Sequence, residues 1–118
     1  MPTNLAVVIG TLSREPELRE LPSGGTVLGL EVSTRLEGGA AETVNVAWYD
    51  APVAAERWRP GNEVLVTGRT RRRFFQVAGS TQSRTEVVAT VAVPTRRAAA
   101  AQAALAAASE HLADALGR

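Results

Sequence analysis

The feature that most restricts the fold of this chain is a two-residue alternation of apolar and polar side chains within short segments. It is clearest over residues 27–34, where Leu28, Leu30 and Val32 alternate with small or polar residues. Residues 42–49 repeat the pattern. Because successive side chains of a β-strand point to opposite faces, this period predicts half-buried strands rather than helices.

Five segments are predicted to be strands, and residues typical of turns separate them. The predicted strands cover residues 5–12, 27–34, 42–49, a segment from 63 into an arginine-rich run, and 85–93. Turns are predicted at 21–26, at Gly38-Gly39 and at Pro60-Gly61-Asn62. The first strand is almost entirely apolar, so we expect it to be buried on both sides. Gly68 lies inside the fourth strand, where glycine commonly marks a bend or bulge.

The alternation also assigns faces to the third and fifth strands. In the third strand, Val44, Val46 and Trp48 are expected to face inward, and Thr43, Asn45, Ala47 and Tyr49 outward. In the fifth strand, one face is expected to carry Val87, Ala89, Val91 and Val93.

A short helix is predicted between the third and fourth strands. Asp50-Ala51-Pro52 has the form of an N-cap followed by a proline in the first helical turn. Three strands, one small helix and two further strands are typical of the OB-fold, a small, partly open barrel. We therefore expect residues 1–95 to form an all-β, five-stranded OB-fold domain.

The composition changes near Pro94. Residues 98–116 contain 11 alanines and neither glycine nor proline, which favours a helix. A weak apolar stripe runs along it, formed by Ala101, Leu105, Ala108, Leu112 and Ala115. We expect residues 96–118 to be an alanine-rich tail that is helical or partly disordered.

Catalysis is not expected from this composition. The chain has no cysteine and a single histidine, His111, which lies in the tail. Glu15 and Glu17 form the closest carboxylate pair, but Arg14 and Arg19 flank them, so we interpret all four as solvated loop charges. No cofactor and no metal are expected.

No apolar run is long enough for a membrane span, and no basic residue precedes the first apolar run, so we expect a cytoplasmic protein.

The basic residues are unevenly distributed. All 13 are arginine, a bias that a genome rich in G and C would also produce, and the net charge is only +1. Residues 64–85 nevertheless contain five arginines and no acidic residue. In an extended strand Arg69, Arg71, Arg73 and Phe75 project to one side, and Tyr49 adds a second ring. Guanidinium groups neutralise phosphates and rings stack on bases, so the segment favours nucleic acid. A solvated strand end with core phenylalanines is the alternative.

Several segments resemble the bacterial single-stranded DNA-binding protein family. The resemblance begins with Asn4-Leu5-Ala6-Val7-Val8-Ile9-Gly10-Thr11-Leu12, Glu15-Pro16-Glu17-Leu18-Arg19 and Pro22-Ser23-Gly24-Gly25. It continues through residues 42–50, Arg59-Pro60-Gly61-Asn62-Glu63-Val64-Leu65-Val66-Thr67-Gly68 and Thr85-Glu86-Val87-Val88, and covers roughly residues 3–93. It implies an OB-fold homotetramer that binds and protects single-stranded DNA in replication, recombination or repair, associated with the nucleoid.

The resemblance and the charge pattern together predict a DNA-binding surface. Stacking is expected from Tyr49, which matches a family aromatic residue of the third strand, and from Phe75, which matches the tryptophan of the family's hairpin. Phosphate contacts are expected from arginines, namely Arg69, Arg71, Arg73 and, in addition, Arg35 and Arg84. The floor is expected to carry small and polar residues, namely Gly29, Ser33, Thr43 and Asn45.

The chain also departs from the family pattern. Two family tryptophan positions fall at Thr43 and near Gly38, while Trp48 and Trp58 are predicted to lie in the core. We therefore expect weaker affinity per nucleotide or a steeper dependence on salt. The sequence lacks the acidic tip that recruits the family's standard partners, so we expect a specialised paralogue that does not recruit them. The alternative is an OB-fold protein-interaction module with weak DNA binding.

Overall fold

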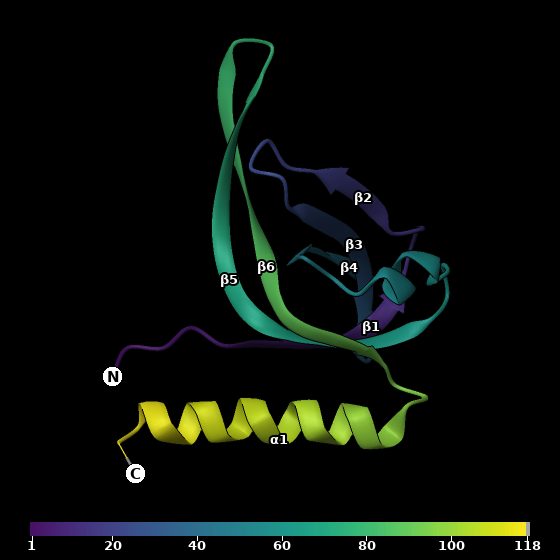
Figure 1. The fold of residues 1–118 in the computed structure, drawn as a ribbon, viewed down its shortest axis with the longest axis vertical. Coiled ribbons are helices and arrows are strands. Elements are labelled where there is room, and N and C mark those ends of the chain that lie inside the picture. Colours follow the sequence, from purple (N-terminus) through teal and green to yellow (C-terminus); the bar gives the residue numbers. More distant parts are fainter. Residues whose placement is uncertain (118) are drawn as a thin grey trace.

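The computed structural model describes residues 1–117, which form a mostly β fold with one α-helix at its C-terminal end (Figure 1). The elements are β1 (Ala6–Leu12), β2 (Glu17–Glu20), β3 (Thr26–Arg35), β4 (Ala41–Tyr49), the 3₁₀-helix η1 (Val53–Arg57), β5 (Glu63–Val77), β6 (Ser80–Pro94) and α1 (Ala98–Ala115). The expected β domain and C-terminal helix are present. The expected strand number is wrong, because the described chain has six strands rather than five.

The additional strand, β2, forms a hairpin with β3. Its register runs from Glu17 opposite Gly29 to Glu20 opposite Thr26, and all four of its residues are exposed. A strand without a buried face has no apolar alternation, which is why the sequence did not predict it. The turn predicted between residues 21 and 26 is confirmed, with Gly24 at a φ of 98°.

The strands form one curved sheet in the order β1-β5-β6-β4-β3-β2. Only short ladders bring its parts together into a barrel. β1 meets β3 at Thr11 opposite Ser33 and Leu12 opposite Val32, and β4 meets β6 in a parallel pairing of two residues. Gly10 makes the first approach possible, since a Cβ there would collide with the Ser33 carbonyl oxygen. The barrel is therefore of the OB type but unevenly closed.

The core confirms the predicted inward faces of β3 and β4, but Ala47, expected to face outward, is nevertheless buried where β6 pairs beside it. Leu28, Leu30 and Val32 are almost completely buried, and Val46 and Trp48 join them in the same cluster. Trp58 packs against this cluster, with its ring centroid 5.7 Å from that of Trp48. Trp48 is therefore a core residue and Trp58, which is half-buried, packs against the core, so both face inward as expected.

β1 differs from the prediction. We expected burial on both sides, but only one side faces the core, and Val7 and Ile9 on the other side are 45% and 52% exposed. Both faces of β1 carry apolar side chains, but no element of residues 1–117 covers the second face closely enough to bury Val7 and Ile9.

The bulge predicted at Gly68 is present and changes the face of β6. Thr67 pairs with Val91 but Gly68 pairs with Ala89, so Thr90 is an extra residue on β6. As a result Val87 and Ala92 lie in the core cluster, whereas Val91 and Val93 do not. The prediction that Val91 and Val93 share the face of Val87 is wrong, because a strict two-residue period does not survive a bulge.

The short helix between β4 and β5 is a 3₁₀-helix, and Asp50 does not cap it. Pro52 occupies the N-cap position. Asp50 has a φ of 52°, and its Oδ1 accepts a hydrogen bond of 3.3 Å from the backbone N–H of Thr26. Asp50 thus fastens the end of β4 to the start of β3, and Ala55 of η1 is buried against the core.

Helix α1 lies along the outside of the barrel, where it packs on β5 and β6 (Figure 1). Ala104 and Ala108 are its buried residues, whereas Leu112 of the predicted stripe is 43% exposed. The N-terminal ammonium group donates to the Ala115 carbonyl oxygen at 3.0 Å, which ties the two ends of the described chain together. Within residues 1–117, no helical segment combines the length and the apolarity that crossing a membrane requires.

Candidate nucleic-acid interface

The β5–β6 hairpin extends well beyond the barrel (Figure 1). Its outer part, residues 71–86, is called the hairpin arm below. Along β5, burial alternates residue by residue: Arg71, Arg73 and Phe75 are half-buried, whereas Arg72 and Phe74 are exposed. The arm therefore has two faces, and Arg71, Arg73 and Phe75 share one of them as the two-residue period predicts.

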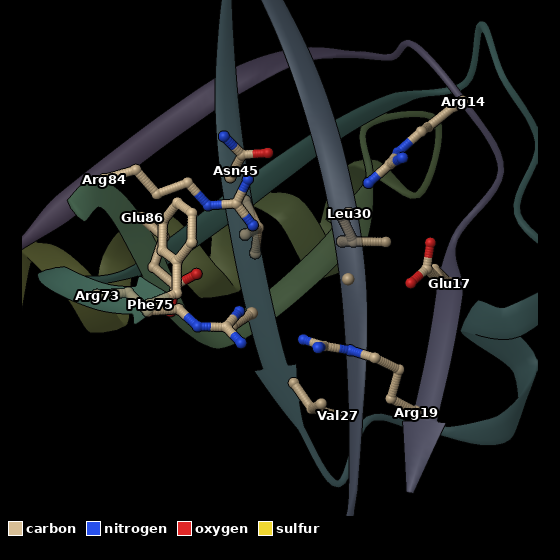
Figure 2. A pocket seen from close by; sticks show the side chains of 13 residues that line it. Arg14, Glu17, Arg19, Val27, Leu30, Asn45, Arg73, Phe75, Arg84 and Glu86 are labelled. Carbon is tan, nitrogen blue, oxygen red and sulfur yellow. The ribbon is translucent and has the colours of Figure 1, made fainter. Parts of the chain in front are cut away.

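A groove of about 260 Å³ lies between the hairpin arm and the strands beside it (Figure 2). Its wall on the arm is made by Arg73, Phe75, Arg84 and Glu86, its floor by Val27, Gly29, Leu30, Asn45, Val46 and Ala47, and its opposite wall by Arg14, Glu17 and Arg19. In Figure 2, Arg73 and Arg84 extend from one side of this groove and Arg14 and Arg19 from the other. Cationic side chains thus approach the same space from both walls.

The charge of the groove is positive. Four arginines and two glutamates line it, and one of the arginines, Arg14, forms an ion pair of 3.5 Å with Glu31 outside the lining. Arg73 has no ion pair with a carboxylate among residues 1–117. A concave surface with an excess of guanidinium groups attracts a polyanion and offers forked donors to its phosphates.

Phe75 is half-buried in the groove wall, with a guanidinium beside its ring. The Cζ atom of Arg84 lies 5.8 Å from the ring centroid, a distance typical of a cation–π contact. The ring is outside the barrel core and lines the groove, so the alternative that Phe75 is a core residue is wrong. A charge and a flat apolar ring in contact are the two groups that a nucleotide can use together.

Tyr49, Arg71 and Glu86 form a connected set beside the groove. Arg71 donates from Nη2 to the Tyr49 hydroxyl at 2.9 Å, and its Cζ lies 5.5 Å from the Tyr49 ring centroid. Arg71 also donates from Nε to Glu86 Oε2 at 3.1 Å, and its Nη2 forms an ion pair with the same oxygen. The hydrogen bond to Glu86 is the main cause that raises the pKa of Arg71, and the hydrogen bond to Tyr49 is the next.

Glu86 is a residue that the sequence reasoning missed. It is buried, and it stands directly opposite Arg71 in the β5–β6 register. The available signal was composition: Glu86 directly follows a segment with five arginines and no acidic residue, and an acidic residue in such a hairpin can neutralise one of them. The Arg71 guanidinium is therefore committed to Glu86 and Tyr49.

The structure does not bring all predicted site residues together. Arg69 lines a separate cavity of about 460 Å³ beside α1, with Asn4 and His111. Arg35 donates to the Gly39 carbonyl oxygen at 3.3 Å and lines another hollow, next to β1, together with Ser33. Thr43 is exposed and does not line the groove. The groove itself gathers Gly29, Asn45, Arg73, Phe75 and Arg84.

The groove also contains residues that were interpreted as loop charges. Arg14, Glu17 and Arg19 form its second wall. The interpretation holds for Arg14 and Glu15, which lie between β1 and β2, but is wrong for Glu17 and Arg19, because β2 folds back along β3 and places Glu17 opposite Gly29, next to the groove floor. Since β2 had no apolar pattern, nothing in the sequence joined these charges to the arginines of the hairpin.

These features define a class of protein: an OB-type barrel with a basic, ring-bearing groove on its outer strands, suited to a nucleic-acid strand. The chain matches the model of the Single-strand binding protein family over residues 3–94, and it belongs to that family. This is a DNA-binding, non-catalytic family, and membership supports binding of single-stranded DNA. Within residues 1–117, no three metal-ligating side chains are grouped as a metal site would need.

Proposed function

We propose that this protein binds single-stranded DNA without sequence preference and protects it, and that the groove beside the hairpin arm is its principal binding surface. The supporting observation is the meeting of Arg73, Arg84 and the Phe75 ring in one groove with Asn45 on its floor. Phosphate neutralisation and base stacking are both independent of base identity, because every nucleotide has a phosphate and a flat face.

Each residue has a distinct role in this proposal. Arg73 and Arg84 contact phosphates, and Phe75 and Tyr49 stack on bases. Residues outside the groove extend the path of the strand, namely Arg35, Thr43 and Arg69, while Arg71 orients Tyr49 through its hydroxyl and ring contacts.

A salt titration tests the proposal. Fluorescence anisotropy of a labelled oligo-dT should show binding whose log affinity falls with log salt concentration by about 0.7 per phosphate contacted. The double variant R73A/R84A should bind more weakly and flatten the slope by about 1.4, twice the value for one phosphate. No binding by the unchanged protein at low salt would overturn the proposal.

A matched control separates local contacts from net charge. Arg57 and Arg96 are exposed and line none of the three cavities described above. R57A/R96A removes the same charge, so it should leave the slope nearly unchanged. Equal losses of DNA affinity in the two double variants would mean that the groove is not the binding surface. A protein partner recovered after nuclease treatment, together with weak DNA binding, would instead favour a protein-interaction module.

We further propose that residues 1–95 are the DNA-binding domain, that the protein assembles as a homotetramer, and that it acts at the nucleoid in the cytoplasm in replication, recombination or repair. The exposed Val7 and Ile9 on β1 support self-association, since two neighbouring apolar side chains on one strand gain from being covered. Sedimentation velocity should show tetramers that the substitution Ile9→Glu dissociates. A monomeric unchanged protein would overturn the assembly but leave DNA binding open.

A further inference from the structure

The face of the hairpin arm that points away from the groove contains a second ring. Phe74 is 65% exposed on that face, although large apolar side chains are normally covered. The register places six residues there, called the outer arm face below: Arg72, Phe74, Gln76, Thr81, Ser83 and Thr85. None of them lines the groove.

Arg72 is tied to the residue that stands opposite this ring. Its Nη1 donates to the Ser83 hydroxyl at 2.8 Å, and Ser83 stands directly opposite Phe74 in the ladder. Directly opposite side chains of an antiparallel pair lie about 5 Å apart at Cβ. The hydrogen bond therefore draws the Arg72 guanidinium across the ladder to the residue opposite Phe74, so that a cation and a ring lie on the same face without the direct cation–π contact that Arg84 and Phe75 make on the groove side.

The charge of the arm indicates what covers Phe74. The outer arm face has one arginine and no carboxylate, and residues 64–85 as a whole contain five arginines and no acidic residue. A purely apolar partner surface would have to desolvate Arg72, whereas a nucleotide can stack on the ring and place its phosphate on the guanidinium. Hydroxyl and amide groups fill the rest of the face and suit a wet, sequence-independent contact.

We propose that Phe74 and Arg72 form a second nucleotide-binding site, on the outer arm face, so that one DNA strand contacts both faces of the hairpin arm. This inference rests on the proposed function. It predicts a strand that leaves the groove, passes around the arm and stacks at least one further base on Phe74. A long strand uses both faces, and a strand too short to pass around the arm uses only the groove.

The test compares Phe74→Leu with Phe75→Leu on oligo-dT of two lengths. Leucine keeps the apolar bulk but removes the ring face, and since Phe74 is mostly exposed, the fold should tolerate it. The short strand has about 5 nucleotides, near the lower limit for one OB-fold, and the long one about 40, more than twice the upper limit. F74L should weaken binding of the long strand by roughly 5- to 100-fold and leave the short strand unchanged. F75L should weaken both.

Crosslinking gives a second readout that does not depend on affinity. Oligo-dT containing 5-iodouracil is irradiated on the unchanged full-length protein, and the adducts are located by peptide mass spectrometry. Adducts at both Phe74 and Phe75 support the inference. Adducts at Phe75 without any at Phe74, or equal long-strand affinities for F74L and the unchanged protein, would overturn it while leaving the proposed function in place.

Two further outcomes distinguish a general failure of DNA binding from a protein contact at Phe74. Failure of the unchanged protein to bind either strand would overturn the proposed function and the second site together. A change in oligomeric state of F74L without DNA, with unaltered long-strand affinity, would show that Phe74 contacts another protein chain and would overturn the second site alone.

Discussion

The two parts of the β5–β6 hairpin have the same strands and the same ladder but opposite surroundings. In the base, residues 63–70 and 87–94, Val64, Leu65 and Val66 are almost fully buried. In the arm, residues 71–86, exposed and half-buried arginines of β5 are followed by two phenylalanines. The change follows the bulge at Gly68, where Thr90 is bulged out of the ladder. One strand pair thus serves as barrel wall and as binding arm because a bulge bends it between the two.

The largest expected effect comes from breaking this junction with Gly68→Ala. A Cβ at residue 68 would collide with the Val88 carbonyl oxygen and lie 2.9 Å from its carbon, and backbone atoms cannot rotate away. We expect a loss of about 3 kcal/mol in the free energy of unfolding, measured by urea denaturation. Gly29→Ala is the control, since its Cβ would meet only the Glu17 carbonyl oxygen at 3.6 Å. Equal losses in both variants would contradict the role of the bulge.

The next effect is confined to the arm. Phe75→Ala should weaken oligo-dT binding by about 2 kcal/mol, because it removes one stacking ring from the groove. The free energy of unfolding should change far less than in a core variant such as Val66→Ala, since Val66 lies fully buried in the base. An unchanged dissociation constant for Phe75→Ala would remove this ring from the binding surface.

Glu86→Gln tests how the Arg71–Glu86 ion pair affects the charge of the arm, because Glu86 is the buried carboxylate there. Glutamine keeps the volume and can still accept a hydrogen bond from Arg71, so we expect a stability loss of about 1 kcal/mol. The Arg71 charge is then free to act on DNA, and the log–log salt slope should steepen by up to about 0.7. Glu56→Gln, an exposed change of the same charge in η1, should leave the slope unaltered. Equal slopes in the two variants would mean that Arg71 does not contact the strand.

The same ion pair has a defined dependence on pH. Folding raises the pKa of Arg71, first through its hydrogen bond to Glu86. A raised pKa contributes stability that is complete below the arginine's unfolded value and is lost only above it. Mildly alkaline buffer should therefore not weaken the fold through Arg71, and the difference between Glu86→Gln and the unchanged protein should stay constant there.

Whether the sequence predicted a strand correctly depends on whether that strand has a buried face. β3 and β4 alternate against one core, so Leu30 and Trp48 were placed correctly from periodicity alone. β2 buries nothing, and its charges gave no sign that Arg19 would line the groove. Glu86 was missed for a related reason: its burial results from pairing with Arg71 across a ladder whose register no local pattern specifies.

The aromatic residues also fall into a buried group and a group outside the core. This difference leads to the smallest of the expected effects, a change in tryptophan emission on binding. Trp48 is 7% exposed and packs on Trp58 within the barrel, while Tyr49 and Phe75 lie with arginines outside it. Bases that stack on the outer rings do not touch either indole, so saturating oligo-dT should quench tryptophan emission only slightly. The positive control is Phe75→Trp, which places an indole in the groove and should give strong quenching on the same titration. Strong quenching of the unchanged protein would require one tryptophan to leave the core on binding, and would contradict a rigid barrel carrying its binding surface on the hairpin arm.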